Sequence, residues 1–103
     1  QLIVPHLTEE TILSHFPKVI VDMGAVKFVC NGANVMRPGI TYLDEFEQSD
    51  LVIVQDEKYR KSLAIGITRF DGETTWNFER GQVITNLHYV GDVFWELKKE
   101  IRN

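Results

Sequence analysis

A change from strand to helix is encoded in the stretch Val19-Ile20-Val21-Asp22-Met23-Gly24-Ala25-Val26-Lys27-Phe28-Val29. The first three residues are β-branched, which is typical of a strand, and we expect that strand to end at Asp22. Apolar residues then recur at helical spacing over residues 23–31, and Gly32 stands where a helix C-cap belongs. Residues 34–37 predict a second short strand, which the turn pair Pro38-Gly39 ends.

The next part of the chain predicts two strands joined by a hairpin. Residues 51–54 are uniformly apolar, as in a strand that is covered on both faces or forms a barrel wall. Leu63, Ile65 and Ile67 alternate with smaller residues, which is the period of a half-buried strand. The polar residues 55–61 between these runs predict a hairpin loop.

The last part of the chain predicts one more helix and two more strands. Asp71 is a suitable N-cap for a short helix that carries Trp76 and ends at Gly81. We expect Trp76 to be a core aromatic, because such rings bury a large area. Residues 83–89 and 93–97 predict the final strands. Short, closely spaced strands with two short helices favour a small mixed barrel, mainly β with an α+β element composition.

The N-terminal segment is interpreted separately. Residues 1–17 predict a strand remnant and a short amphipathic helix with Ile12, Leu13 and Phe16 on one face. Such a helix cannot bury its apolar face alone, so we expect it to pack on a neighbouring domain. The predicted organisation is a linker and remnant of an upstream N-terminal domain at 1–17, the main domain at 18–97, and a C-terminal tail at 98–103.

Composition limits the class of protein. The chain has 103 residues, of which 44% are apolar and 25% charged, as in one ordinary globular domain. No run approaches the ~20 apolar residues of a membrane helix, so no membrane association is expected. The single cysteine, Cys30, cannot form an internal disulfide and is interpreted as a small buried apolar residue. This cysteine usage favours a reducing compartment, and we expect a cytoplasmic protein.

Charge is unevenly distributed along the chain. The net charge of -4 counts against a nucleic-acid binder that relies on bulk positive charge. Acidic residues are concentrated in the stretch from Asp44 to Glu57, whereas residues 18–40 hold Lys18, Lys27 and Arg37 against Asp22 alone. An acidic edge and a mildly basic face can therefore coexist on one domain.

The residue types that support catalysis or metal binding do not form a recognisable site. His6, His15 and His88 are scattered, and no ligand pair has a zinc spacing. No serine lies in a strained turn beside a base, and the glycines match no nucleotide-binding loop. We therefore predict no catalytic residue, no metal site and no cofactor.

Several of these motifs together resemble the PUA domain, the module named for pseudouridine synthases and archaeosine transglycosylases. The resemblance rests on residues 21–40, Ser49-Asp50-Leu51, Ala64-Ile65-Gly66 and Arg80-Gly81-Gln82-Val83, and it covers about 18–97. Leu87-His88-Tyr89 followed by Asp92 and Trp95 is similar to the malignant-T-cell-amplified protein family and its archaeal relatives. The resemblance implies a pseudo-barrel of about six strands with two short helices.

The resemblance also implies a function. It suggests a noncatalytic RNA-binding domain of a translation- or ribosome-associated protein that recognises structured RNA, such as tRNA or rRNA. The implied partners are RNA, the small ribosomal subunit and a protein partner in translation initiation or recycling. Carried over position by position, RNA contacts are implied at Gly24, Ala25, Lys27, Phe28, Asn34, Met36, Arg37, Pro38 and Gly39.

Physical chemistry is consistent with these residue types. Gly24 and Ala25 have almost no side chain, so a sugar-phosphate backbone can approach closely. A helix that starts at Met23 is expected to offer free amide donors to phosphate. The guanidinium of Arg37 can bind a phosphate with two hydrogen bonds, whereas Lys27 acts as a point charge.

Two other interpretations remain open. The domain is a protein-interaction module if the acidic stretch from Asp44 to Glu57, or the helix face of Ile12, Leu13 and Phe16, binds a partner. It is the RNA-targeting domain of a larger tRNA- or rRNA-modifying enzyme if a catalytic domain precedes it.

Overall fold

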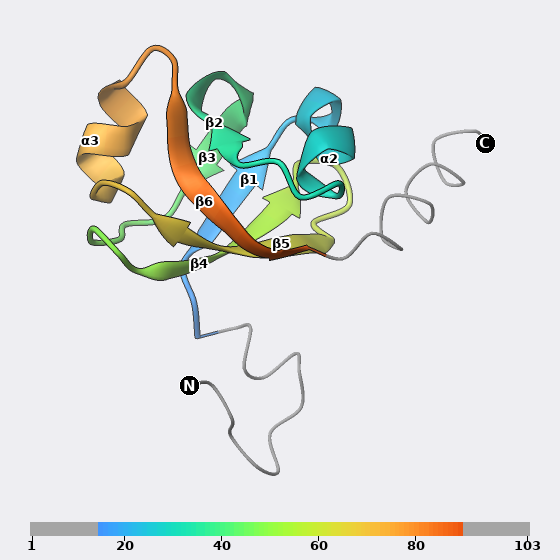
Figure 1. The fold of residues 1–103 in the computed structure, drawn as a ribbon, viewed down its shortest axis with the longest axis horizontal. Helices are drawn as coiled ribbons and strands as arrows, with labels where there is room; N and C mark the ends of the chain where they lie inside the picture. The colour runs from blue at the N-terminus through green and yellow to red at the C-terminus, as the bar shows by residue number, and fades with distance from the viewer. Residues whose placement is uncertain (1–14, 90–103) are drawn as a thin grey trace, which may run out of the picture.

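A computed structural model of the chain describes residues 15–89. These residues form six strands, two short α-helices and one 3-10 turn (Figure 1). In chain order the elements are β1 (Lys18–Val21), α2 (Met23–Val29), β2 (Val35–Met36), η1 (Arg37–Gly39), β3 (Ile40–Leu43), β4 (Leu51–Asp56), β5 (Ser62–Thr68), α3 (Gly72–Asn77) and β6 (Gln82–Tyr89).

All six strands belong to one sheet, in the order β2-β6-β5-β4-β1-β3. The β1–β4 pair is parallel, with Lys18 opposite Ile53, and every other neighbouring pair is antiparallel. The two edge strands, β2 and β3, are consecutive in the chain and are joined directly by η1. The sheet curls so that these edges approach each other, which gives a nearly closed pseudo-barrel (Figure 1). The predicted fold class is therefore confirmed.

The core lies inside this curled sheet. Val19 and Val21 of β1 and Val52 and Val54 of β4 share one buried cluster, because alternate residues of a strand face the same side. The intervening Ile20 and Ile53 are buried as well, outside that cluster. Leu63 of β5 belongs to the same cluster. Helix α2 packs on the core through Val26 and Val29, and Cys30 is buried there as predicted.

The sequence-based prediction differs from the structure in four places, one of which is α3, which ends at Asn77 and not at Gly81. Strand β3 was not predicted from the sequence; it is an edge strand whose central residues, Thr41 and Tyr42, are exposed. In β5, Ile65 and Ile67 are only half-buried, whereas Ala64, Gly66 and Thr68 are buried. The small residues face inward there because β6 crosses close by: a Cβ on Gly66 would lie 2.5 Å from Cγ2 of Ile84. The predicted hairpin loop is shorter than 55–61, since β4 continues to Asp56.

Some predictions lie outside the described residues. They are the helix and domain remnant before His15, the strand at 93–97, and the C-terminal tail at 98–103. Between His15 and Tyr89, the structure contains no helix that is long and apolar enough to cross a membrane.

Candidate functional site

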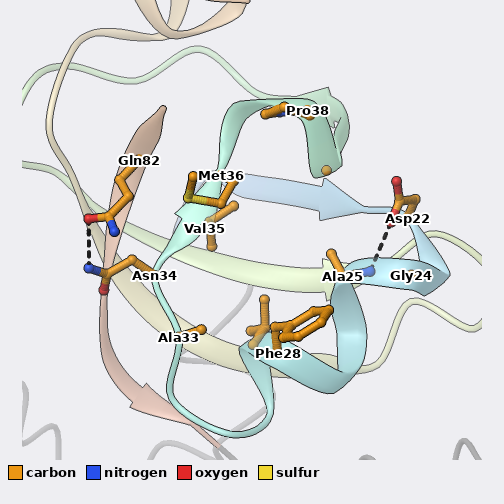
Figure 2. Close-up of a pocket in the computed structure, with 12 residues that line it drawn as sticks. Asp22, Gly24, Ala25, Phe28, Ala33, Asn34, Val35, Met36, Pro38 and Gln82 are labelled. Carbon is orange, nitrogen blue, oxygen red and sulfur yellow. Dashed lines mark hydrogen bonds between the residues drawn. The ribbon is translucent and has the colours of Figure 1, made fainter. Parts of the chain in front are cut away.

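An open groove of about 530 Å³ runs between α2 and the segment formed by β2 and η1 (Figure 2). Most of the residues predicted to bind RNA lie together in its lining, even though the lining is drawn from four elements and their connecting loop. The lining residues are Asp22, Gly24, Ala25, Phe28, Val29, Ala33, Asn34, Val35, Met36, Pro38, Gly39 and Gln82. Lys27 and Arg37 are the two predicted site residues outside this lining.

Helix α2 forms one wall of the groove. Its N-cap is Asp22, whose Oδ1 accepts a hydrogen bond from the amide of Ala25 at 2.9 Å. Val26 and Val29 hold the helix against the core, and Gly24, Ala25, Phe28 and Val29 line the groove from the helix. Phe28 is 59% exposed, which leaves much of its aromatic ring available to a ligand.

The first turn of α2 does not offer the free amides that the sequence suggested. Oε2 of Glu57 accepts a hydrogen bond from the amide of Met23 at 3.0 Å, and Asp22 occupies the amide of Ala25. Two of the first three helical amides are therefore already bonded to carboxylates. The expectation that phosphate binds free donors at Met23 is wrong for this helix start, because the chain supplies its own acidic groups.

The opposite wall consists of β2 and η1. Met36 is 46% exposed and faces the groove with Pro38, so this wall is apolar (Figure 2). The walls approach each other closely at Gly39, where an added Cβ would lie 3.2 Å from the Cβ of Ala25. The carbonyl oxygen of Gly39 also accepts a hydrogen bond from the amide of Asp22 at 2.8 Å. Small residues on both sides thus suit this close approach, and an added Cβ at Gly39 would need a shift of a few tenths of an ångström.

An amide network closes the other end of the groove. Nδ2 of Asn34 donates to Oε1 of Gln82 at 3.1 Å, and Oδ1 of Asn34 accepts from the amide of Asn86 at 2.9 Å (Figure 2). Nδ2 of Asn86 donates to the carbonyl oxygens of Val29 and Ala33, each at 3.0 Å. This network fixes the α2–β2 loop to β6. Sequence analysis missed Gln82 and Asn86, because they lie 48 and 52 residues from Asn34.

Arg37 is engaged in contacts within the protein. Its Nε donates to the carbonyl oxygen of Trp76 at 3.1 Å, and its Nη1 donates to the carbonyl oxygen of Ile40 at 3.1 Å. The guanidinium carbon lies 4.3 Å from the centroid of the Trp76 ring. The prediction that Trp76 is a core aromatic is wrong: the ring is 45% exposed and stacks with Arg37 instead. Lys27 is exposed on α2.

The acidic stretch has a structural role in this fold. Oδ2 of Asp44 accepts from the amide of Lys18 at 2.8 Å, and Oδ2 of Asp50 accepts from the amide of Glu47 at 2.8 Å. Asp56 is fully buried and accepts hydrogen bonds from three backbone amides of the β4–β5 turn. Several carboxylates of the stretch therefore bond to loop and strand-end amides of the domain itself.

The chemistry available in the groove is that of a binding surface. Its lining combines exposed apolar side chains with the amides of Asn34 and Gln82, and its one charged residue is Asp22. Among residues 15–89, no group of three or more His, Cys, Asp or Glu residues could hold a metal ion. The groove thus offers stacking, close backbone approach and amide hydrogen bonding.

The family model of the PUA domain matches residues 17–90. Curated relatives agree with this match. An uncharacterized protein of Methanocaldococcus jannaschii is 46% identical over 78% of this chain and 50% of its own length. Translation machinery-associated protein 20 of Schizosaccharomyces pombe is 37% identical, covering 79% of this chain and 48% of the relative. Human malignant T-cell-amplified sequence 2 is 33% identical, covering 84% and 52%. The chain spans about half the length of these relatives.

Solved structures give the same result. A hypothetical protein from Pyrococcus horikoshii superposes with a TM-score of 0.69 at 42% identity, covering 78% of this chain and 48% of the other. The archaeal box H/ACA sRNP Nop10-Cbf5 complex contains a chain that superposes with a TM-score of 0.74 at 26% identity, covering 79% and 26%. Similar domains thus occur both in translation-associated proteins and within a larger ribonucleoprotein.

Proposed function

The chain belongs to the PUA domain family, and on that premise we propose that it is a noncatalytic RNA-binding module of a translation- or ribosome-associated protein. The single observation that carries the proposal is the groove between α2 and the β2–η1 segment. It gathers Gly24, Ala25, Phe28, Asn34, Met36, Pro38 and Gly39, which the family resemblance implies as RNA contacts.

The groove suits an unpaired nucleotide better than a rigid duplex. The base of an unpaired nucleotide can stack on the exposed ring of Phe28, while Met36 packs against it from the opposite wall. Asn34 and Gln82 bond to each other through Nδ2 and Oε1, and the remaining hydrogen-bonding capacity of the two amides, including Nε2 of Gln82, can match the polar edge of a base. A loop or end of a structured RNA such as tRNA or rRNA offers bases that are free to enter.

The cellular role is proposed from the relatives' names. The name of translation machinery-associated protein 20 supports a role in translation. The family resemblance adds the proposed place at the small ribosomal subunit and a protein partner in translation initiation or recycling. A cytoplasmic location follows from that role. Because the lining has no cation, we expect the chain to bind RNA weakly, with a dissociation constant on the order of micromolar or poorer.

The test is a titration of the chain with fluorescently labelled tRNA at about 50 mM salt. The Phe28→Ala variant should bind about tenfold more weakly, because base stacking on an aromatic ring contributes about 1–3 kcal/mol. Leu87→Ala is the matched control, since Leu87 is 55% exposed on β6 and lies outside the groove lining. Circular dichroism should show that both variants stay folded. Equal affinity of wild type and Phe28→Ala would remove the groove as the binding site.

The two other interpretations make distinct predictions. A protein-interaction module would retain its partner in a pull-down after nuclease treatment, whereas an RNA-dependent association would be lost. The RNA-targeting domain of a modifying enzyme would be preceded by a catalytic domain in the full-length gene. The carboxylates of Asp44, Asp50 and Asp56 bond to backbone amides of the domain, so a docking surface on the acidic stretch would depend on the exposed Glu45 and Glu47.

A further inference from the structure

The turn between β4 and β5 carries three basic residues in a short span. Lys58, Arg60 and Lys61 define what is called here the basic turn. Lys58 and Arg60 are exposed, and Lys61 is half-buried. In the sequence, the basic turn directly follows the acidic stretch, which ends with Asp56 and Glu57.

The structure buries one of these acids inside the turn and leaves the other, Glu57, exposed beside the cations. Asp56 is fully buried, and its carboxylate accepts hydrogen bonds from the amides of Lys58 at 3.0 Å and Lys61 at 2.7 Å. The amide of Tyr59 donates to the same carboxylate. The carboxylate of Asp56 therefore lies inside the turn and holds its backbone. Lys58 and Arg60 are exposed on this fixed turn, and the Lys58 ammonium lies 5.3 Å from the centroid of the Tyr59 ring.

Glu57 connects the basic turn to the groove. Its Oε2 accepts from the amide of Met23, and its own amide donates to the carbonyl oxygen of Val21 at 2.9 Å. The turn is thus tied to the start of α2, where Asp22 and Gly24 line the groove. Figure 1 shows the β4–β5 connection passing beside α2. Lys27 lies one helical turn after Met23, on the same face of that helix.

This placement supplies the charge that the groove lacks. An RNA strand carries one negative charge per nucleotide, and its affinity depends on cations near the phosphates. The groove lining contains Asp22 and no lysine or arginine. A strand that leaves the groove past Gly24 would meet Lys58 and Arg60 at the adjoining turn.

We propose that the basic turn is a second RNA contact, which binds backbone phosphates of the strand that leaves the groove at Gly24. This inference rests on the proposed RNA-binding function and adds to it a sequence-independent electrostatic contact. The groove would receive a base, and the basic turn would hold the following phosphates. Because Asp56 fixes the turn in advance, little backbone entropy is lost when the phosphates bind.

The test compares two double variants that remove equal charge. Lys58→Gln with Arg60→Gln alters the basic turn, whereas Lys18→Gln with Arg69→Gln alters cations elsewhere: Arg69 follows the opposite end of β5. Affinity for labelled tRNA is measured between about 50 and 200 mM salt. The turn variant should bind about 5- to 20-fold more weakly at low salt, and its slope of log affinity against log salt should be shallower by about 1.4, the value for two single-strand phosphate contacts.

The outcomes separate this inference from the proposed function. If wild type and control bind with equal slopes and the turn variant has the wild-type slope, the basic turn is not a contact and the groove proposal stands. If wild type binds no RNA at low salt, both proposals fail. A charge reversal, Lys58→Glu with Arg60→Glu, should weaken binding further than the glutamine pair. A reversal with no added effect would also overturn the inference.

Discussion

The side chain of Arg37 clamps Trp76 from two directions: its guanidinium carbon lies 4.3 Å from the ring centroid, and its Nε donates to the Trp76 carbonyl oxygen at 3.1 Å. These contacts join η1 to α3 across 39 positions of sequence. The backbone amide of Arg37 also donates to the carbonyl oxygen of Gly81 at 2.9 Å. The groove wall that carries Met36 and Pro38 is therefore held from behind by α3 and the start of β6.

Removing this clamp should affect both stability and binding. We expect Arg37→Ala to lower the free energy of unfolding by about 1–3 kcal/mol, since a stacked cation and two hydrogen bonds are lost. Trp76→Ala should weaken tRNA binding as well, although Trp76 lies outside the groove lining. Arg37→Lys should recover little of the lost stability, because a lysine ammonium cannot stack on the Trp76 ring as the planar guanidinium does.

Thermal unfolding and tRNA titration of the same samples check this prediction. If Arg37→Ala loses RNA affinity at unchanged stability while Trp76→Ala binds normally, Arg37 is a direct RNA contact and its clamping role is secondary. That result would restore the interpretation suggested by the sequence.

Gly66 should tolerate no side chain. An added Cβ would lie 2.5 Å from Cγ2 of Ile84 and 3.0 Å from the carbonyl oxygen of Thr85, so Gly66→Ala should separate β5 from β6. We expect a loss of about 1–3 kcal/mol or more in unfolding free energy, measured by urea denaturation. In the double variant Gly66→Ala with Ile84→Ala, the loss of unfolding free energy should be smaller than the sum of the losses in the two single variants. The reason is that shortening the Ile84 side chain relieves part of the clash. Strict additivity would contradict a steric cause.

Gly81 should resist substitution for a different reason. Its φ is +104°, yet nothing lies within 4 Å of the position of a Cβ. Gly81→Ala should therefore cost about 1–2 kcal/mol through backbone strain alone. Changes at neighbouring residues should not relieve this cost, in contrast to Gly66. Urea denaturation of Gly81→Ala that matches wild type would show that the turn adopts another conformation.

Helix α3 should weaken in acid through its N-cap. The amide of Thr74 donates to Oδ1 of Asp71 at 2.7 Å, and this hydrogen bond lowers the pKa of Asp71. A lowered folded-state pKa means that the stabilisation is fully present above the unfolded value of about 3.9 and is lost as pH falls through the folded pKa. The Tm difference between wild type and Asp71→Ala should shrink between neutral pH and about pH 2. A constant difference would show that the charge of Asp71 is irrelevant to the cap.

Local sequence patterns were sufficient for most of the fold. The β-branched run of β1, the helical spacing of α2 and the cap at Asp71 each reflect a preference expressed within a few residues. Strand β3 was missed although Ile40, Thr41 and Tyr42 are residue types enriched in strands, because the adjacent exposed Thr41 and Tyr42 give no alternation of buried and exposed positions. The prediction of which β5 residues face inward was also wrong, because the crowding at Gly66 comes from Ile84 and Thr85 of β6.

The candidate site likewise has a part that could be predicted from the sequence and a part that could not. Gly24, Ala25 and Phe28 were found because they lie on one short helix that the family motif covers. The contacts of Asn34 with Gln82, of Arg37 with Trp76, and of Glu57 with Met23 join segments 34 to 48 residues apart. No local sequence pattern encodes such pairs. The hydrogen bonds that engage Arg37 and the first amides of α2 are therefore visible only in the three-dimensional structure.

The strand order has a consequence for how the molecule acquires its groove. Strands β4 and β5 are neighbours in sequence, and the turn locked by Asp56 favours their early pairing during folding. The groove walls depend instead on β2 meeting β6, with Val35 opposite Ile84, and closing that longer loop costs more chain entropy than closing the β4–β5 hairpin. We therefore expect affinity for RNA to emerge late in refolding, only after the C-terminal part of the barrel has docked, so that a partly folded chain cannot occupy the RNA.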